Sequence, residues 1–208
     1  MRLYLSSFRM GGQPGSLLEL VDRDRPAAVI ANAIDDASPD GRKEGVQREL
    51  DDLSELGLEA RELDLRNYFE TPGRIAGELL NYGLVWLRGG NVFVLRYALA
   101  ASGADAALVE LLRDDALVYA GYSAGPCALG PSLRGFELVD EPDGVRAAYG
   151  AEPVWEGLGV LDYTIVPHVD SPDHPETERC SSLAAHFRAE GVPHRTLRDG
   201  EVLVIDDR

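Results

Sequence analysis

The chain has few cysteines and far fewer basic than acidic residues. Its two cysteines, Cys127 and Cys180, are too few for a disulfide framework in 208 residues, so we expect two reduced thiols. There are 36 acidic residues against 20 basic ones, which gives a formal net charge of -16. Nucleic acids and anionic membranes attract Lys- and Arg-rich faces, so this balance argues against either as a partner.

Long apolar runs are also missing. No stretch of about 18 apolar residues is present to span a bilayer, and residues 1–7 lack the apolar core of a signal peptide. We therefore expect a cytoplasmic protein with no membrane partner. The hydrophobic content of 45% is sufficient for a sizeable core, and no linker or repeat interrupts the chain. Residues 1–208 are predicted to form one α/β domain.

Strands and helices are predicted to alternate along the chain. Short apolar runs predict strands at residues 3–7, 27–33, 58–65, 84–87, 117–120, 161–166 and 201–205. Apolar residues at helical spacing predict helices at residues 42–56, 71–80, from 92 onward, 105–112 and 177–190. Residues 131–159, rich in Gly, Pro and acids, predict a functional extended loop or hairpin. The alternation is typical of a mostly parallel sheet whose sites lie at the carboxyl ends of its strands.

One of these strands runs directly into a candidate nucleophile. The segment Gly121-Tyr-Ser-Ala-Gly125 fits the pattern G-x-S-x-G, in which a strand turns sharply into a helix and holds the serine hydroxyl out at the end of the sheet. The apolar residues 117–120 before it and the helix-compatible residues 127–129 after it supply that context. Ser123 is therefore the candidate nucleophile, with an ordinary strand-helix turn as the alternative.

A serine hydroxyl needs an adjacent base, normally histidine, and the chain has four histidines. His168 follows the predicted strand at residues 161–166 and should lie at the same end of the sheet as the nucleophile. It is the candidate base. His174 lies in the acidic loop beyond it, whereas His186 and His194 are expected to be structural or surface residues.

Three acidic residues could orient that histidine. Asp140, Glu141 and Asp143 follow a strand-like run at residues 136–139. A solvated acidic turn is the alternative for each of them, and the residues alone leave the choice open. The order Ser, Asp, His matches that of α/β-hydrolases, although those enzymes place more chain between the three members.

An oxyanion site requires two backbone N–H groups aimed at one point. The amide of Ala124, directly after the candidate nucleophile, is one donor. Gly89 and Gly90 follow another predicted strand, and Gly90 can bring a second amide close because it carries no side chain. Gly89, Asn91 and Tyr122 flank this point and are candidates for substrate contacts.

Four segments together carry a resemblance to a known family. Arg88-Gly-Gly-Asn91, Gly121-Tyr-Ser-Ala-Gly125, Asp140-Glu-Pro142 and Val166-Pro-His168, in this order, resemble the peptidase E (aspartyl dipeptidase) and cyanophycinase family of serine peptidases. The similarity extends over nearly the whole chain. It implies a three-layer sandwich with a mostly parallel central sheet and helices on both faces, similar to class I glutamine amidotransferases.

The same resemblance implies roles for individual residues. Ser123, His168 and Asp140 would form the catalytic triad, and the amides of Gly90 and Ala124 would bind the oxyanion. The resemblance implies a short peptide as substrate, no cofactor and no metal, and it is compatible with a homodimer.

The sequence departs from peptidase E at one position. Peptidase E carries an arginine just after the Glu-Thr of the helix that follows the catalytic histidine, and this arginine pairs with the substrate's aspartyl carboxylate. Glu178 occupies the matching position here, where it would repel an aspartyl side chain. Arg179 lies about 100° further around the helix and should point elsewhere. We expect strict aspartyl specificity to be lost, with a basic or neutral residue tolerated instead. The alternative for Glu178 is an acid in the first turn of the helix that the helix dipole stabilises.

These observations favour a serine peptidase that cleaves short peptides through an acyl-enzyme. The alternatives are an esterase or amidase acting on a small metabolite, and a catalytically inactive binding module on the same fold. A metal site within residues 168–176 matches no established ligand spacing. Thiol chemistry is not expected either, because Cys127 lies four residues past Ser123 in the predicted helix.

Overall fold

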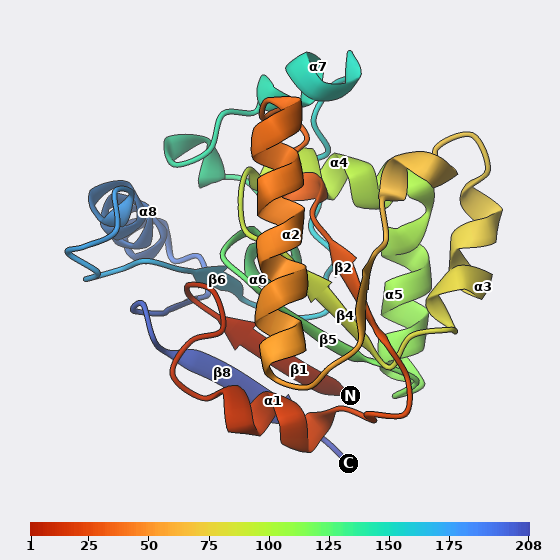
Figure 1. The fold of residues 1–208 in the computed structure, drawn as a ribbon. Coiled ribbons are helices and arrows are strands. Elements are labelled where there is room, and N and C mark those ends of the chain that lie inside the picture. The colour runs from red at the N-terminus through yellow and green to blue at the C-terminus, as the bar shows by residue number, and fades with distance from the viewer.

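A six-stranded sheet in the order β3-β2-β4-β5-β1-β8 forms the centre of the molecule (Figure 1). The computed structural model describes all 208 residues. The strands are β1 (Arg2–Ser6), β2 (Ala27–Ile30), β3 (Ala60–Glu62), β4 (Leu84–Leu87), β5 (Val118–Tyr122) and β8 (Val202–Asp206). All neighbours pair in parallel except β8, which runs antiparallel to β1 at one edge. The expected mostly parallel α/β sheet is confirmed.

Helices cover both faces of this sheet. Helices α1 (Pro14–Leu20) and α2 (Pro39–Glu55) pack on one face, where they contribute to a buried cluster that includes Trp86. The larger cluster on the other face takes in α3 (Ile75–Leu79), α4 (Val92–Ser102), α5 (Ala104–Arg113) and α6 (Ala124–Ala128). The result is the three-layer arrangement visible in Figure 1.

A second, smaller sheet lies beside the first. It pairs β6 (Thr164–Val166) in parallel with β7 (His194–Thr196). Helix α8 (Thr177–Glu190) connects these two strands and buries Cys180, Leu183 and Phe187. Strand β6 therefore does not extend the central sheet, although its carboxyl end reaches the same region of the molecule.

The ends of the helices follow from local sequence. Helix α2 begins after Ser38, whose side chain accepts a hydrogen bond from the Gly41 amide. Helix α4 begins after Asn91, whose side chain accepts from the amides of the second and third helical residues. It ends at Gly103, which has a φ of 74° that favours glycine.

Several expected elements differ from those observed. Residues 136–139 do not form a strand: Phe136–Leu138 is a short 3-10 helix, η4. The region around it also holds α7 (Gly144–Tyr149) and a single β-bridge between Ser132 and Glu156, so it is a folded excursion rather than a hairpin. Three further 3-10 helices are η1 (Asn32–Ile34), η2 (Leu65–Tyr68) and η3 (Pro72–Arg74). Neither α1 nor β7 was predicted from the sequence, because both are short and lack a long apolar pattern.

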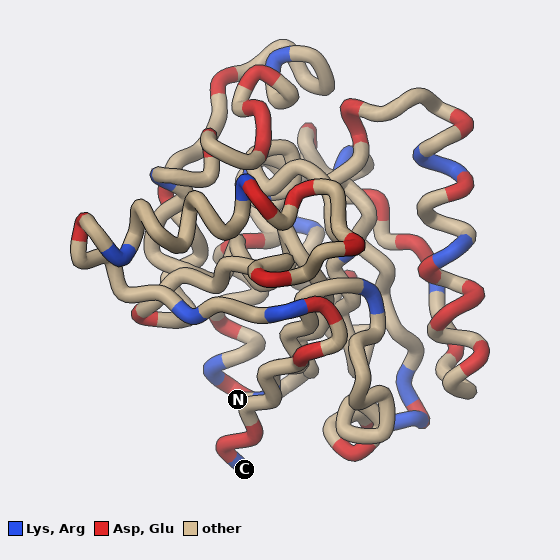
Figure 2. Tube along the Cα trace, turned by 90° about the vertical axis from the view of Figure 1, so that its left-hand side faces the viewer, with Lys and Arg blue, Asp and Glu red and all other residues tan.

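No single helix has both the length and the apolar character needed to cross a membrane; α4 and α5 meet that test only when taken together, and they are bent by 86°. Acidic residues are spread over most of the surface helices and loops, with fewer basic residues among them (Figure 2). The negative charge is therefore distributed over many elements.

One buried carboxylate joins α2 to the ends of two central strands. Glu49 is completely buried. Its Oε2 accepts a hydrogen bond from Trp86 Nε1 at 2.9 Å, and its Oε1 accepts one from the Tyr122 hydroxyl at 2.8 Å. Arg88 Nε lies 3.3 Å from the same Oε1 and supplies the compensating positive charge. These contacts hold the ends of β4 and β5, from which the chain continues to Gly89 and Ser123.

We predict that Glu49→Ala lowers the free energy of unfolding by about 3–5 kcal/mol, because it leaves a half-buried arginine and two buried donors without their acceptor. Glu59→Ala is the matched control. Glu59 pairs with Arg61 on the surface, where both side chains are 65% exposed, so its loss should change stability by no more than about 0.5 kcal/mol. Urea unfolding followed by circular dichroism measures both; equal losses would contradict the structural role of Glu49.

Candidate active site

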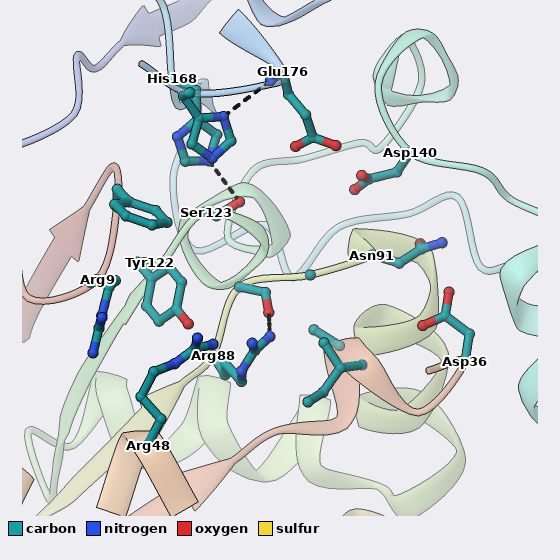
Figure 3. Close-up of a pocket in the computed structure, with 16 residues that line it drawn as sticks. Arg9, Asp36, Arg48, Arg88, Asn91, Tyr122, Ser123, Asp140, His168 and Glu176 are labelled. Carbon is teal, nitrogen blue, oxygen red and sulfur yellow. Dashed lines mark hydrogen bonds between the residues drawn. The ribbon is translucent and has the colours of Figure 1, made fainter. Parts of the chain in front are cut away.

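Loops that follow the carboxyl ends of the parallel strands meet around one cavity of about 400 Å³ (Figure 3). This is the position at which sites in α/β sheets form. The lining residues come from the segments after β1, β2, β4 and β5, from α2, and from the loops before α4, α7 and α8. They are Phe8, Arg9, Ala33, Ile34, Asp36, Arg48, Arg88, Gly89, Gly90, Asn91, Tyr122, Ser123, Asp140, His168, His174 and Glu176.

Ser123 stands on a tight turn between β5 and α6. Its backbone has a φ of 53° and a ψ of -109°, which is uncommon for a residue with a side chain. Gly121 permits this turn, because a side chain there would run into the carbonyl oxygen of Leu87 on the neighbouring strand. The strand-turn-helix context expected for the G-x-S-x-G pattern is thus present, and the Ser123 hydroxyl points into the cavity (Figure 3).

His168 contacts the serine hydroxyl directly. Its Nε2 lies 3.1 Å from Ser123 Oγ, within the distance required of a general base. The residue is almost fully buried and adopts a φ of 60° just beyond β6. Its backbone N–H donates to Ser7 Oγ at 2.9 Å, which ties the second sheet to the end of β1. The sequence placed His168 at the correct end of the fold, although on a different sheet.

The carboxylate beside His168 belongs to Asp199. His168 Nδ1 lies 2.7 Å from Asp199 Oδ1. Asp199 is positioned by strand pairing, because His168 and Asp199 follow the adjacent parallel strands β6 and β7. Its Oδ1 also accepts from Ser7 Oγ at 2.8 Å, and its amide donates to Ser171 Oγ at 2.8 Å. Two serines therefore fix both the backbone and the carboxylate of Asp199.

Asp140 does not make the contact with His168 that the family resemblance implied. Its carboxylate instead accepts a hydrogen bond from the Val92 amide at 2.8 Å, at the first turn of α4. Burial raises the pKa of Asp140 to about 7. The neighbouring Glu141 accepts through its backbone carbonyl from Asn91 Nδ2, and Asp143 is an exposed partner of Arg146. The physical reason is that η4 packs against α8 through Phe136 and Phe187, and the chain beyond it brings Asp140 to the first turn of α4 instead of to His168.

The sequence contained little signal for Asp199. Its strand, β7, is only His194-Arg195-Thr196, which lacks an apolar run, and Asp199 itself precedes a glycine in an ordinary turn. Only the pairing of β7 with β6 brings it to His168. That pairing joins residues about thirty positions apart in the chain.

The imidazole of His168 is enclosed by other rings. His174 stacks on it with a centroid distance of 3.6 Å and an interplanar angle of 2°. Phe8 meets both rings edge-on, at 6.0 Å from His168 and 5.4 Å from His174. Burial lowers the pKa of His168, the hydrogen bond to Asp199 opposes this effect, and positive charge on His174 adds to it. These surroundings favour the neutral imidazole that a general base requires.

His168, His174 and Asp199 also form the one group of side chains in the protein that could hold a metal ion, since a ligand atom from each lies within 4.8 Å of the others. A metal bound there would use atoms that otherwise join Asp199 to His168.

Cys127 is not an alternative nucleophile. Its Sγ lies 3.4 Å from the Ile165 carbonyl oxygen, and burial raises the pKa of this thiol well above the ordinary value.

Of the two candidate oxyanion donors, Gly90 lines the cavity and Ala124 directly follows Ser123, which also lines it. The amide of Gly90 has no acceptor within the protein. Gly90 has a φ of 147°, and a side chain there would lie 2.5 Å from the carbonyl oxygen of Ala33, so only glycine fits. Ala124 is the first residue of α6, where backbone amides have no partner within the helix.

Three residues were expected to flank the oxyanion site, Gly89, Asn91 and Tyr122. All three line the cavity, but the side chains of Asn91 and Tyr122 have partners within the protein. Asn91 caps α4 with its oxygen and donates its amide nitrogen to Glu141. The Tyr122 hydroxyl is occupied by Glu49. Gly89 lies against the Tyr122 ring, which a side chain at this position would strike.

Glu178 does not lie in the cavity. It is exposed in the first turn of α8 and borders a separate hollow with Asp170 and Thr177. Helix α8 buries the face that carries Cys180 and Leu183, which leaves position 178 on the outer side. The carboxylates that do line the cavity are Asp36, Asp140 and Glu176.

Solved structures share this fold. A peptidase from an acI-B1 actinobacterium superimposes with a TM-score of 0.72 at 17% identity and covers 98% of this chain and 82% of its own. A Listeria monocytogenes EGD-e protein, provisionally described as a peptidase E, gives a TM-score of 0.74 at 21% identity and covers 98% and 97%. At these identities the likeness concerns the fold alone.

Sequence relatives agree with the fold. Peptidase E of Streptomyces coelicolor A3(2) is 31% identical over 151 residues, 69% of this chain and 57% of that protein. An uncharacterized peptidase of Listeria monocytogenes is 28% identical over 124 residues, 60% of this chain and 57% of that protein. The match spans a little over half the length of these curated relatives. The family model for peptidase family S51 matches residues 11–208. The chain therefore belongs to peptidase family S51.

Proposed function

We propose that the protein is a serine peptidase that hydrolyses short peptides through Ser123, His168 and Asp199. The observation that carries the proposal is the continuous hydrogen-bond chain from Asp199 through His168 to Ser123. A serine in such a chain has a base within reach, and that base has an acid to hold its tautomer. Membership of a peptidase family supports hydrolysis of peptide bonds over other acyl-transfer reactions.

In the first half of the reaction, Ser123 Oγ attacks the scissile carbonyl carbon and gives its proton to His168 Nε2. Asp199 keeps the remaining ring proton on Nδ1 and stabilises the imidazolium that forms. The carbonyl oxygen, now negative, is placed to accept hydrogen bonds from the amides of Gly90 and Ala124.

In the second half, His168 returns the proton to the leaving amine, and an acyl-enzyme remains on Ser123. Water then attacks the ester with His168 again acting as base, and the acid product leaves. The low exposure of His168 keeps its ring in one orientation through both steps.

The cavity supports a small substrate. Its volume of about 400 Å³ falls within the range of small-ligand sites. We further propose that strict aspartyl specificity is not retained, because Glu178 replaces the arginine implied by the resemblance and lies on the outer side of α8.

We predict that an uncharged fluorophosphonate labels the wild-type protein and that Ser123→Ala abolishes labelling and lowers the kcat for short peptides by about six orders of magnitude. Ser54→Ala, at an exposed position on α2, is the matched control and should behave as wild type. Mass spectrometry and peptide hydrolysis measure the two effects. Labelling with turnover of esters but not peptides would favour the esterase reading, and an unlabelled wild type would favour a binding module.

We predict that Asp199→Asn slows labelling of Ser123 by roughly 10²–10⁴-fold, because His168 loses the group that holds its tautomer. Asp140→Asn makes the same chemical change at the carboxylate that does not contact His168. It should leave the labelling rate within about threefold of wild type. The extent of labelling, sampled at fixed times, gives the rate for each variant. A slower rate for Asp140→Asn than for Asp199→Asn would restore Asp140 to the triad.

We predict that the labelling rate falls on the acidic side with a midpoint below 6.5, the ordinary pKa of histidine. Neutral His168 is the base, so the rate is lost as the pH falls through its pKa, and burial lowers that pKa. His174→Gln should move the midpoint upward, because a nearby positive charge is removed. A wild-type midpoint above 6.5 would contradict the assignment of a buried, neutral base.

A further inference from the structure

The charged residues of the cavity are separated into two groups. Figure 3 shows Arg9, Arg48 and Arg88 on one side and Asp36, Asp140 and Glu176 on the other, with Ser123 between them. A cationic group of this kind stands out in a protein with a net charge of -16. The cavity therefore offers different partners to the two ends of a bound molecule.

Two of the three arginines already have partners. Arg9 Nη2 contacts both carboxylate oxygens of Asp52, at 2.6 and 2.8 Å. Arg88 donates through Nη1 to the Gly89 carbonyl at 2.5 Å and lies 3.3 Å from Glu49 through Nε. These two guanidinium groups are held by the protein itself.

Arg48 is different. Its guanidinium makes no hydrogen bond to the protein, and its one acidic neighbour is Glu49 at 3.8 Å. Both oxygens of Glu49 already accept hydrogen bonds from Trp86 and Tyr122. The Arg48 side chain is 45% exposed and borders the cavity, so its donors are free to meet a ligand. Three arginines face two carboxylates at this end, which leaves one positive charge without a partner.

We propose that Arg48 binds a carboxylate of the peptide substrate and is a specificity-determining residue of the cavity. An arginine fork matches a carboxylate through two parallel hydrogen bonds, and the free donors of Arg48 meet that requirement. This inference rests on the proposed peptidase function and names the class of peptide that the site selects.

The opposite group of charges fits the other end of such a peptide. Asp36, Asp140 and Glu176 are three carboxylates without an arginine or lysine among the lining residues on their side. A substrate ammonium would reduce the repulsion among them. A short peptide with free ends would therefore place its amine toward these carboxylates and its carboxylate toward Arg48, with the scissile bond near Ser123.

The carboxylate could come from the peptide's carboxyl terminus or from an acidic side chain, and two matched pairs of substrates separate these sources. The first pair has neutral side chains and either a free or an amidated carboxyl terminus. The second pair is amidated and carries either Glu or Gln. The four peptides are assayed by kcat/KM with wild type, Arg48→Met, Arg48→Lys and the control Lys43→Met. Lys43 is an exposed cation on the same helix α2 that lies outside the cavity.

We expect wild type to prefer the charged member of one pair over its neutral counterpart by about 10- to 100-fold, the range of a charge-assisted hydrogen bond. Arg48→Met should lose that preference, chiefly through KM, and Arg48→Lys should keep part of it because the charge remains without the fork. Lys43→Met should keep all of it, which excludes an effect of overall charge.

The inference is overturned if wild type prefers neither charged peptide, or if Arg48→Met keeps the preference. Labelling of Ser123 by the uncharged fluorophosphonate separates this failure from that of the proposed function. A wild type that is labelled and hydrolyses peptides without any preference for a carboxylate would refute the role of Arg48 alone. An unlabelled wild type would refute the peptidase proposal as well.

Discussion

The hydrogen bond between His168 and Asp199 is the contact on which the candidate site depends. It forms because β6 and β7 pair in parallel and each delivers one residue from its carboxyl end. Ser7 joins this pair to the central sheet by accepting from the His168 amide and donating to the Asp199 carboxylate. The second sheet is thereby held beside the carboxyl ends of the central strands, where Ser123 follows β5. A site whose residues come from two sheets needs such a link to keep its reacting atoms at the distances that the reaction requires.

A second set of contacts holds the opposite side of the cavity. Glu49 is buried with Trp86, Tyr122 and Arg88, and this network fixes the ends of β4 and β5. The strand ends carry the candidate oxyanion amide of Gly90 and the candidate nucleophile. Because Arg48 is adjacent to Glu49 on α2, the helix that stabilises the strands also presents a free cation to the cavity. One helix, α2, therefore both stabilises the ends of β4 and β5 and places a positive charge at the cavity.

Family membership establishes the fold of this chain, whereas the residues that line the cavity determine which substrate it can bind. The S51 family match and the shared fold extend over nearly the whole chain, yet the solved structures are only 17–21% identical to it. Such likeness leaves the lining of the cavity free to vary, because loops at strand ends can change without disturbing the sheet. Glu178 lies on the outer side of α8 and Arg48 borders the cavity from α2, and the shared fold does not dictate either charge.

The sequence alone determined the mostly parallel sheet, the turn at Ser123 and the position of His168 after a strand. These features depend on apolar runs, glycines and neighbours close in the chain, so they are visible in local patterns. Asp199 and Arg48 were not visible in this way. Asp199 reaches His168 only because a three-residue polar strand pairs with β6. Arg48 borders the cavity only because α2 packs on the sheet with the adjacent Glu49 against Trp86 and Tyr122. The tertiary structure decided both, because contacts between distant segments depend on packing that no local pattern records.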